Sequence, residues 1–230
     1  PSFDKITEQV ERGQADYGLL PIENTSSGSI NEVFDLLQHA QVSIVGEVTQ
    51  TVEHCLLTNP GTELKDVNKI FAHHQPFAQC SRFLQGLGDI QHEACDSTSS
   101  ALQSALDTPQ SAAIASAQAG KNIGLEVIKT GLANQAENHS RFIVVAREAL
   151  QVSTQLPTKI SLIMATKQQV GSLADALMVF KCHNINMVKL ESRPVPGNPW
   201  EEVFYVDLLA NTAEKRVQEA MEQLKEHTQF

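Results

Sequence analysis

The sequence between residues 69 and 106 decides the fold class, and it reads KIFAHHQPFAQCSRFLQGLGDIQHEACDSTSSALQSAL. Short apolar runs at Lys69–Ala72 and Asp89–Ala94 have the length of buried strands. Each run is followed by a helical pattern, at Phe77–Leu84 and at Ala101–Leu106. Strands that alternate with helices at this spacing predict an α/β class with a largely parallel sheet.

The same alternation continues on both sides of this stretch. Apolar residues at helical spacing predict helices, and short apolar runs that end at polar or proline residues predict strands. The further predicted elements are a helix over residues 3–12, a strand over 15–22, a helix over 30–37, strands over 42–48, 51–57 and 111–115, and a helix over 117–121. Residues 1–150 therefore form the main α/β domain of this prediction.

A second domain is predicted after a linker. Residues 151–158 are polar, lack periodicity and carry Pro157, as expected of an interdomain segment. Residues 159–230 then predict the order strand, helix, strand, strand, helix, which is one strand short of a ferredoxin-like α+β sandwich. The predicted segments are 160–165, 171–181, 185–191, 203–209 and 213–226.

Composition excludes several classes of protein. The 230 residues carry a net charge of −10 with no basic cluster, which argues against nucleic acid or an anionic membrane as partner. No apolar run is long enough to span a membrane, and the first residues lack the features of a signal peptide. Four widely spaced cysteines indicate reduced thiols in a cytoplasmic protein. His92 and Cys95 have ligand-like spacing, but no second pair completes a metal set, so neither metal nor cofactor is expected.

Two hydroxyl-rich loops are candidate anion sites. Thr25–Ser29 and Ser97–Ser100 each precede a predicted helix, whose N-terminus offers unpaired N–H groups. The alternative is that these hydroxyls only cap the helices. Glu23 and Asn24 end a predicted strand, which is the usual ligand position in open α/β sheets, although Asn24 could equally close a surface turn.

Ser140 and Arg141 are the strongest candidates for catalytic residues. They stand at the start of an apolar run, within Asn138-His139-Ser140-Arg141-Phe142. Arginine can hold a carboxylate through two parallel hydrogen bonds, and a hydroxyl can donate to a departing oxygen. The alternative is a hydroxyl at a strand edge beside a solvated arginine.

Several motifs in order resemble the prephenate dehydratases that carry a C-terminal ACT domain, and especially the bifunctional bacterial enzymes with chorismate mutase. The dehydratase-like motifs are residues 21–28, His54-Cys55-Leu56, His73 with Gln75, Ser97-Thr98-Ser99 and residues 138–142. The ACT-like motifs are Gly171-Ser172-Leu173-Ala174 and Glu191-Ser192-Arg193-Pro194, and residues 197–202 resemble the bifunctional enzymes.

The resemblance implies a catalytic domain of two subdomains, similar to periplasmic binding proteins, followed by a ferredoxin-like ACT domain. It implies conversion of prephenate to phenylpyruvate, water and carbon dioxide in L-phenylalanine biosynthesis. Ser140 and Arg141 would then be catalytic. The implied substrate-binding residues are Glu23, Asn24, Thr25, Ser26, Ser27, Gly28, Ser97, Thr98, Ser99, Asn138 and Phe142.

The same resemblance implies feedback inhibition by L-phenylalanine and at least a homodimer. The implied L-phenylalanine-binding residues are Gly171, Ser172, Leu173, Ala174, Asn186, Glu191, Ser192, Arg193 and Pro194. Two rival functions stay open: arogenate dehydration, and a non-catalytic ligand-binding or regulatory module.

Two departures from the family pattern accompany the resemblance. Ser140 replaces the usual threonine, so the hydroxyl is kept but the methyl group that restricts its rotamer is lost. The family's opening strand and first motif, the mutase helices and the last ACT strand are not found in residues 1–230. We therefore expect the chain to be a fragment.

Overall fold

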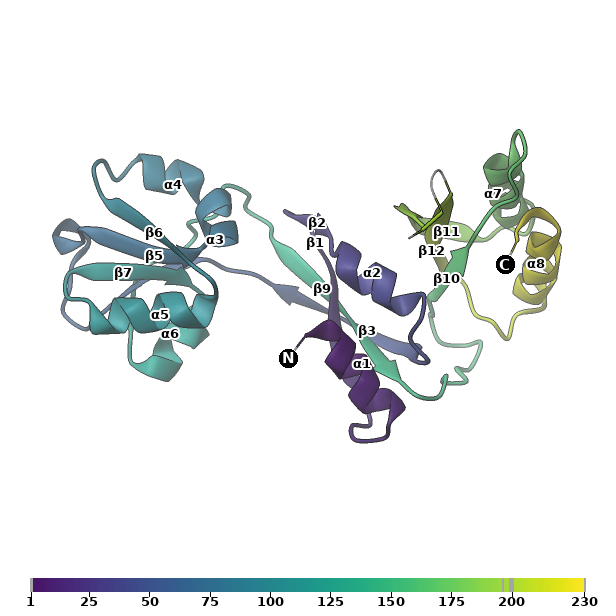
Figure 1. Ribbon diagram of the computed structural model, residues 1–230, viewed down its shortest axis with the longest axis horizontal. Helices are drawn as coiled ribbons and strands as arrows, with labels where there is room; N and C mark the ends of the chain where they lie inside the picture. The colour runs from purple at the N-terminus through teal and green to yellow at the C-terminus, as the bar shows by residue number, and fades with distance from the viewer. Residues whose placement is uncertain (1, 196, 199–200, 230) are drawn as a thin grey trace. The chain divides into compact units, whose positions relative to one another are not determined.

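The computed structural model describes residues 2–195, 197–198 and 201–229, and Figure 1 shows the order of its elements. The helices are α1 Phe3–Glu11, α2 Asn31–Leu37, α3 His74–Gln79, α4 Ser81–Gln85, α5 Thr98–Asp107, α6 Ala117–Ile123, α7 Ser172–Cys182 and α8 Lys215–His227, with a 3-10 turn at Leu64–Asp66. The strands are β1 Gly18–Asn24, β2 Gly28–Ser29, β3 Ser43–Thr51, β4 Cys55–Thr58, β5 Lys69–His73, β6 Gln91–Cys95, β7 Ser111–Ala115, β8 Glu126–Lys129, β9 His139–Ala146, β10 Ile160–Met164, β11 Asn186–Pro194 and β12 Glu202–Leu209.

A five-stranded sheet has the order β6-β5-β7-β4-β8. Strand β5 is parallel to β6 and β7, whereas β4 is antiparallel to β7 and β8. The predicted parallel core is confirmed, but the sheet is mixed. Sequence reasoning missed β8, a short edge strand whose residues are mostly exposed.

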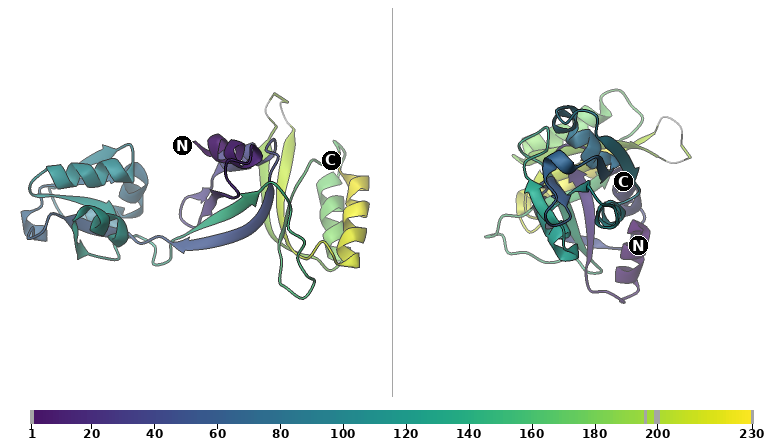
Figure 2. Two further views of the ribbon diagram at one scale, coloured as in Figure 1. Left: turned by 90° about the horizontal axis from the view of Figure 1, so that it is seen from below. Right: turned by 90° about the vertical axis from the view of Figure 1, so that its left-hand side faces the viewer.

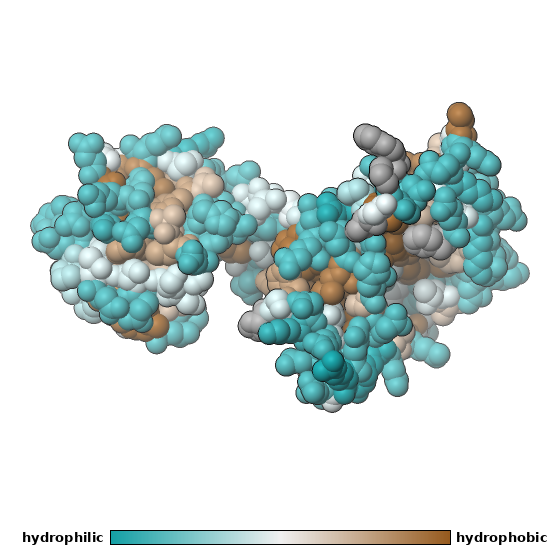
Figure 3. All heavy atoms as spheres, viewed as in Figure 1, coloured by the Kyte–Doolittle hydropathy of each residue, from teal (hydrophilic) through white to brown (hydrophobic). Residues whose placement is uncertain are grey.

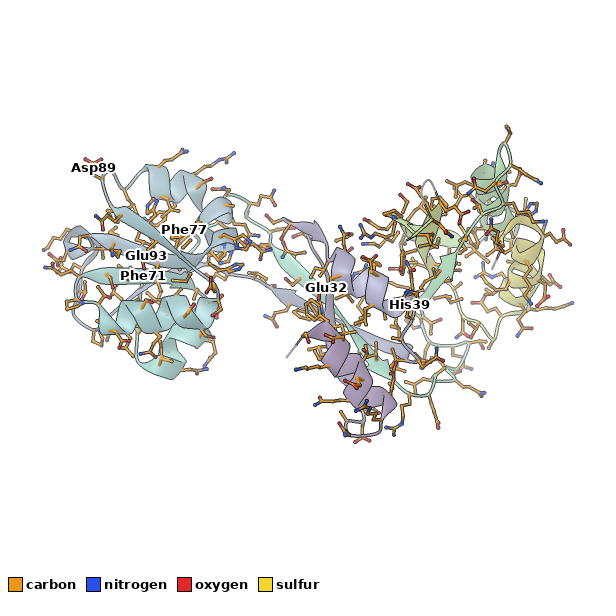
Figure 4. The ribbon with its side chains drawn as sticks, viewed as in Figure 1. Glu32, His39, Phe71, Phe77, Asp89 and Glu93 are labelled. Carbon is orange, nitrogen blue, oxygen red and sulfur yellow. The ribbon has the colours of Figure 1, made fainter. Side chains whose placement is uncertain are left out.

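Helices cover both faces of this sheet, as Figure 1 shows. On one face, α5 packs its alanines and Leu102 against Phe71 of β5. On the other face, Cys80, between α3 and α4, and Leu84 of α4 pack with Ile70. The register pairs Phe71 with Glu93, and both are labelled in Figure 4. The predicted single helix over 77–84 is two helices, because the backbone at Cys80 leaves the helical region (φ −112°, ψ 16°).

A second sheet has the order β2-β1-β9-β3. Its apolar residues alternate along β1, where Leu20 and Ile22 are buried, and along β9, where Ile143 and Val145 are buried. They form one core with Val33 and Phe34 of α2 and with Val203 and Tyr205 of β12, among others. Hydrophilic side chains cover the outer face of α1 in Figure 3, as expected of a helix that buries one stripe.

The third sheet, β10-β12-β11, is antiparallel, and α7 and α8 pack on it through a shared core that includes Phe180 and Leu224. Figure 2 shows the two helices side by side. The predicted order strand, helix, strand, strand, helix is confirmed for residues 160–227.

Contacts divide the chain into two compact units, which differ from the domains predicted from the sequence. Unit 1 contains Pro1–Ile22, Ile30–Glu47 and Ile143–Phe230, and unit 2 contains Glu23–Ser29 and Val48–Phe142. In the part of the chain that the structure describes, no helix has the length and apolarity needed to cross a membrane.

Candidate active site

Asn24, at the end of β1, is the centre of a polar cluster in unit 2. Its side-chain nitrogen donates to Asn138 Oδ1 (2.7 Å), to the backbone carbonyl of His139 (3.1 Å) and to Ser140 Oγ (3.0 Å). Ser140 therefore accepts a hydrogen bond, and this bond does not use its own O–H donor. Asn24 and Ser140 are 116 positions apart, so only the pairing of β1 with β9 in the second sheet brings them together.

The hydroxyl-rich loop after Asn24 is a hairpin turn and not a helix cap. Asn24 Oδ1 accepts from the amides of Ser26 (2.9 Å) and Ser27 (3.0 Å) and from the Ser27 hydroxyl (3.0 Å). Gly28, with φ +82°, then begins β2, and helix α2 starts only after Ile30. The expected helix opening at this loop is therefore wrong, and the turn-closing alternative for Asn24 is confirmed.

The same loop is tied to β9 through Thr25. The Thr25 amide donates to the carbonyl of His139, and the Thr25 hydroxyl accepts from the His139 amide, both at 2.9 Å. The amides of Thr25, Ser26 and Ser27 are thus engaged within the protein. The loop therefore does not present the row of unpaired amides that the sequence suggested.

Asn138 extends the cluster into the interior. It is only 3% exposed, and its side-chain nitrogen donates to Gln79 Oε1 at 3.1 Å. The same Gln79 oxygen lies 2.6 Å from Nε2 of His54, which is 7% exposed. The expectation of a buried, satisfied histidine at position 54 is confirmed, although His54 precedes β4 instead of lying within a strand.

Ser140 and Arg141 have different partners. Consecutive side chains of a strand project to opposite faces, and the contacts agree with this geometry. Ser140 accepts from Asn24, whereas Arg141 Nε lies 2.9 Å from Glu23 Oε1 in an ion pair whose arginine side chain is 14% exposed. The hydroxyl and the guanidinium are thus not the side-by-side pair that the sequence suggested. Phe142 follows them in β9 and is half-buried.

The second hydroxyl cluster, Ser97 to Ser99, lies at the carboxyl edge of the five-stranded sheet. Strands β5 and β6 end together, since His73 pairs with Cys95. β7 runs parallel to them, and its last residue, Ala115, pairs with Cys55 at the start of β4. His54 therefore belongs to the same edge. This is the edge at which α/β sheets usually bind ligands.

At this edge Ser97 is a helix cap. Its hydroxyl accepts from the Ser100 amide, and the Ser100 hydroxyl accepts from the Ser97 amide, both at 3.1 Å. The capping alternative is thus confirmed for Ser97, while Thr98 and Ser99 are exposed in the first turn of α5.

His73 and His74 lie with their ring centroids 3.8 Å apart. The expectation that they point oppositely is wrong, because His74 begins α3 and does not continue the strand. Burial, together with the neighbouring His74 charge, lowers the pKa of His73 from its ordinary value.

The C-terminal motifs occupy one end of the third sheet. β10 and β11 are both antiparallel to β12, so they run in the same direction, and Met164 and Ser192 both pair with Phe204. Glu191–Pro194 at the end of β11 therefore lies level with the end of β10, from which the chain leads into Gly171 (φ +83°) and the first turn of α7. Asn186 lies at the opposite end, where it lines a cavity of about 430 Å³ with Phe180 and Lys181.

Arg193 is engaged with α2. Its Nε and Nη2 donate to the two oxygens of Asp35 at 3.0 and 2.8 Å, and the hydrogen bond to Asp35 is the main cause of its raised pKa. Figure 4 labels Glu32 of this helix and His39, which follows its end, and Asp35 lies between them in the sequence. Tyr205 donates to the carbonyl of Phe34 (2.5 Å) beside it, and burial raises the pKa of Tyr205 to about 12.

The described residues contain no group of three or more His, Cys, Asp or Glu side chains placed to hold a metal ion. The four cysteines are free thiols, and burial raises the pKa of Cys80 to about 12. Two residues of the motif at 197–202, Pro199 and Trp200, lie outside the described residues. Gln79 was missed by sequence reasoning, since nothing local distinguishes its amide from the other glutamines.

Comparison with known proteins identifies the family. A family model described as prephenate dehydratase matches residues 1–150. The bifunctional chorismate mutase/prephenate dehydratase of Enterobacter agglomerans is 50% identical over 228 residues, which cover 98% of this chain and 59% of that protein. The chain thus spans 59% of the length of this relative.

Two solved structures have the same fold. The prephenate dehydratase of Arthrobacter aurescens in complex with L-Phe has a TM-score of 0.86 at 26% identity, covering 99% of this chain and 76% of that one. A structure described as GqqA, a novel type of quorum quenching acylase, has a TM-score of 0.85 at 27% identity, covering 100% and 83%. The family model and the 50% identical relative together show that this chain, a mixed α/β protein, belongs to the prephenate dehydratase family.

Proposed function

We propose that this chain catalyses the decarboxylating dehydration of prephenate to phenylpyruvate. The observation that carries the proposal is the hydrogen bond from Asn24 to Ser140. It occupies an acceptor position of the hydroxyl and leaves the O–H to donate to a ligand. Family membership supplies the substrate class, and the hydroxyl supplies the group that the reaction needs.

The reaction breaks two bonds in prephenate and transfers one proton. The ring carboxylate leaves as carbon dioxide, and its electron pair enters the ring. The ring C–O bond breaks at the opposite carbon, and the departing hydroxide takes up one proton and becomes water. Because the ring becomes aromatic, the protein has only to orient the dianion and stabilise the leaving oxygen. Ser140 would donate its hydrogen bond to that oxygen.

Ser140 and Arg141 lie near the start of β9, where a substrate can reach both faces of the strand, so Arg141 would orient a carboxylate of the substrate. Its Nε faces Glu23, which fixes the direction of the guanidinium, and arginine carries five N–H donors in total. Glu23 would then position Arg141 at the substrate-binding site. The hydroxyls of Thr25, Ser26 and Ser27 would line the same site, and Thr98 and Ser99 would contribute from the edge of the five-stranded sheet. Phe142 would pack against the ring.

Replacement of Ser140 tests this role. Ser140→Ala removes the donor, and loss of one such group in an active site costs about 10²–10³ in kcat. Ser153→Ala, in the segment before β10, is the matched control and should keep full turnover. Full activity in Ser140→Ala would show that the hydroxyl is not the donor.

We further propose that residues 159–230 form an ACT module that binds L-phenylalanine and inhibits turnover. The strand order β10-β12-β11, with α7 and α8 packed on the sheet, supports this assignment, as does the placement of Gly171–Ala174 and Glu191–Pro194 at one end of it. Inhibition requires that L-phenylalanine bind two states of the protein with different affinities. We also propose at least a homodimer, a cytoplasmic location and, in the whole protein, a chorismate mutase domain.

Gly171 offers a test of the regulatory site. At φ +83° an alanine is strained, so Gly171→Ala should weaken L-phenylalanine binding in calorimetry while turnover without inhibitor persists. Gly61→Ala, at φ +80° in unit 2, carries the same backbone cost away from the motif and should bind L-phenylalanine normally. Equal affinities in the two variants would place the ligand elsewhere.

Arogenate dehydration and simple ligand binding are the competing functions. Turnover rates measured side by side on prephenate and arogenate decide between the two substrates. Binding of prephenate without any release of phenylpyruvate would indicate a binding module that has kept the fold.

A further inference from the structure

The Ser140 hydroxyl ends a chain of polar side chains whose hydrogen-bond directions follow from the backbone. The chain runs from His54 through Gln79, Asn138 and Asn24 to Ser140, with donor–acceptor distances of 2.6, 3.1, 2.7 and 3.0 Å. All five residues belong to unit 2. Each amide could in principle be turned by 180°, so the direction of the chain has to be established.

The backbone around Asn24 fixes the first amide. The N–H groups of Ser26 and Ser27 can only donate, and they face one end of the Asn24 side chain at 2.9 and 3.0 Å. The carbonyl of His139 can only accept, and it faces the other end at 3.1 Å. Asn24 therefore presents its oxygen to the loop and its nitrogen to Asn138 and Ser140.

This orientation propagates to His54. Because Asn24 donates to Asn138, the oxygen of Asn138 must face it, and the nitrogen of Asn138 then donates to Gln79. The atom of Gln79 that accepts this bond is Oε1, and the same oxygen lies 2.6 Å from His54 Nε2. An oxygen can only accept here, so Nε2 of His54 must carry a proton.

We infer that His54 is a positioning residue, whose Nε2–H pairs with the far end of the amide chain and stabilises the direction, set by the backbone at Asn24, that leaves the Ser140 O–H to a ligand. His54 is 7% exposed and Asn138 is 3% exposed, so neither side chain can exchange its hydrogen-bond partner for bulk water. A partner lost from this chain would therefore leave a buried polar group unpaired. The carbonyl of His54 accepts from the Leu132 amide (3.2 Å), which anchors the residue from its backbone. The catalytic consequence rests on the proposed function; the direction of the chain does not.

A side chain at position 54 that can only accept a hydrogen bond would be incompatible with this direction of the hydrogen-bond chain. It would require Gln79 to turn its nitrogen toward residue 54, and that nitrogen would then also face the donor of Asn138. Either one buried donor is left unpaired, or Asn138 and Asn24 turn as well and conflict with the backbone groups at the loop. A glutamine at position 54 keeps an N–H donor at nearly the reach of Nε2, and a glutamate replaces it with an acceptor.

The experiment compares His54→Gln with His54→Glu in the full chain. The glutamine variant should retain kcat on prephenate, whereas the glutamate variant should lose roughly tenfold or more in kcat with little change in KM. His183, whose Nε2 faces Gln223 Oε1 at 3.0 Å on the surface, provides the matched pair His183→Gln and His183→Glu. Both control variants should keep the full kcat.

Nitrogen-15 spectra of the imidazole rings in the unmodified chain give a second readout that needs no turnover. We expect Nε2 of His54 to carry a proton. The Nδ1–H tautomer would overturn the inference, and so would equal kcat values in the two His54 variants. If the unmodified protein does not convert prephenate, the proposed function fails. The tautomer of His54 still decides the direction of the hydrogen-bond chain.

Discussion

Replacing Asn24 by aspartate changes one atom and reverses the polarity of the cluster around Ser140. Aspartate has nearly the shape of asparagine, and one of its oxygens can still accept from the amides of Ser26 and Ser27. The other oxygen would face Asn138 Oδ1 and the carbonyl of His139, both of which now receive an N–H. Ser140 would turn and donate its proton to the new carboxylate.

The magnitude follows from the bonds that are lost. Asn138 Oδ1 loses its donor, whereas the carbonyl of His139 keeps its hydrogen bond from the Thr25 amide. A buried polar group left unpaired costs about 1–3 kcal/mol. We therefore expect a loss of about 1–3 kcal/mol in the free energy of unfolding, since Asn24 itself is only half-buried. With a urea dependence of about 2–3 kcal/mol per molar, the unfolding midpoint of unit 2 should fall by about 1 M. Turnover should fall further than stability alone explains, since the Ser140 proton is no longer directed to the substrate.

Urea unfolding and phenylpyruvate release should be measured together, with Asn134→Asp as the control. Asn134 is another asparagine in unit 2 that donates to Ala78 O (3.1 Å) and Ser81 Oγ (2.9 Å) and accepts from the Arg82 amide (3.0 Å). Its aspartate variant should lose comparable stability and keep kcat under native conditions. An Asn24→Asp variant with unchanged midpoint and unchanged turnover would refute the reasoning.

Three further outcomes are expected. Ser140→Thr keeps the hydroxyl and adds the methyl group that limits its rotamers, so kcat should stay equal or rise in a steady-state assay; a large loss would contradict an oriented donor. Asp35→Asn removes the charge that Arg193 binds through two bonds, and it should weaken inhibition by L-phenylalanine several-fold with basal kcat preserved; inhibition curves that coincide with the unmodified chain would exclude this coupling. Cys182 is exposed, whereas Cys80 is buried and its pKa is raised to about 12. Iodoacetamide should therefore label Cys182 in the native protein and Cys80 only after unfolding, which peptide mass spectrometry would show.

The sequence predicted best what depends on local periodicity. The strand and helix alternation around β5, β6 and α5 appears in apolar spacing, and so does the order of elements from β10 to α8. Strand β8 was missed because it is four residues long and mostly exposed. The helix predicted over residues 30–37 is confirmed as α2, but the hydroxyl-rich loop before it resembles a cap in the sequence, whereas Gly28 at φ +82° makes it a hairpin.

The candidate site was predictable in its members but not in its geometry. The hydroxyl of Ser140 and the amide of Asn24 were both identified, yet the bond between them joins positions 116 apart and has no local signal. The pairing of Arg141 with Glu23, and not with Ser140, depends on which faces of β1 and β9 meet. Gln79 could not be found at all, since its importance comes only from lying between His54 and Asn138.

The most direct test of the central claim is the release of phenylpyruvate from prephenate by this chain, with and without L-phenylalanine. The Enterobacter agglomerans relative, measured in parallel, controls for the assay. We predict turnover that depends on Ser140 and is suppressed by L-phenylalanine. Prephenate binding with no phenylpyruvate, under conditions in which the relative is active, would contradict the account and leave a binding module built on the same fold.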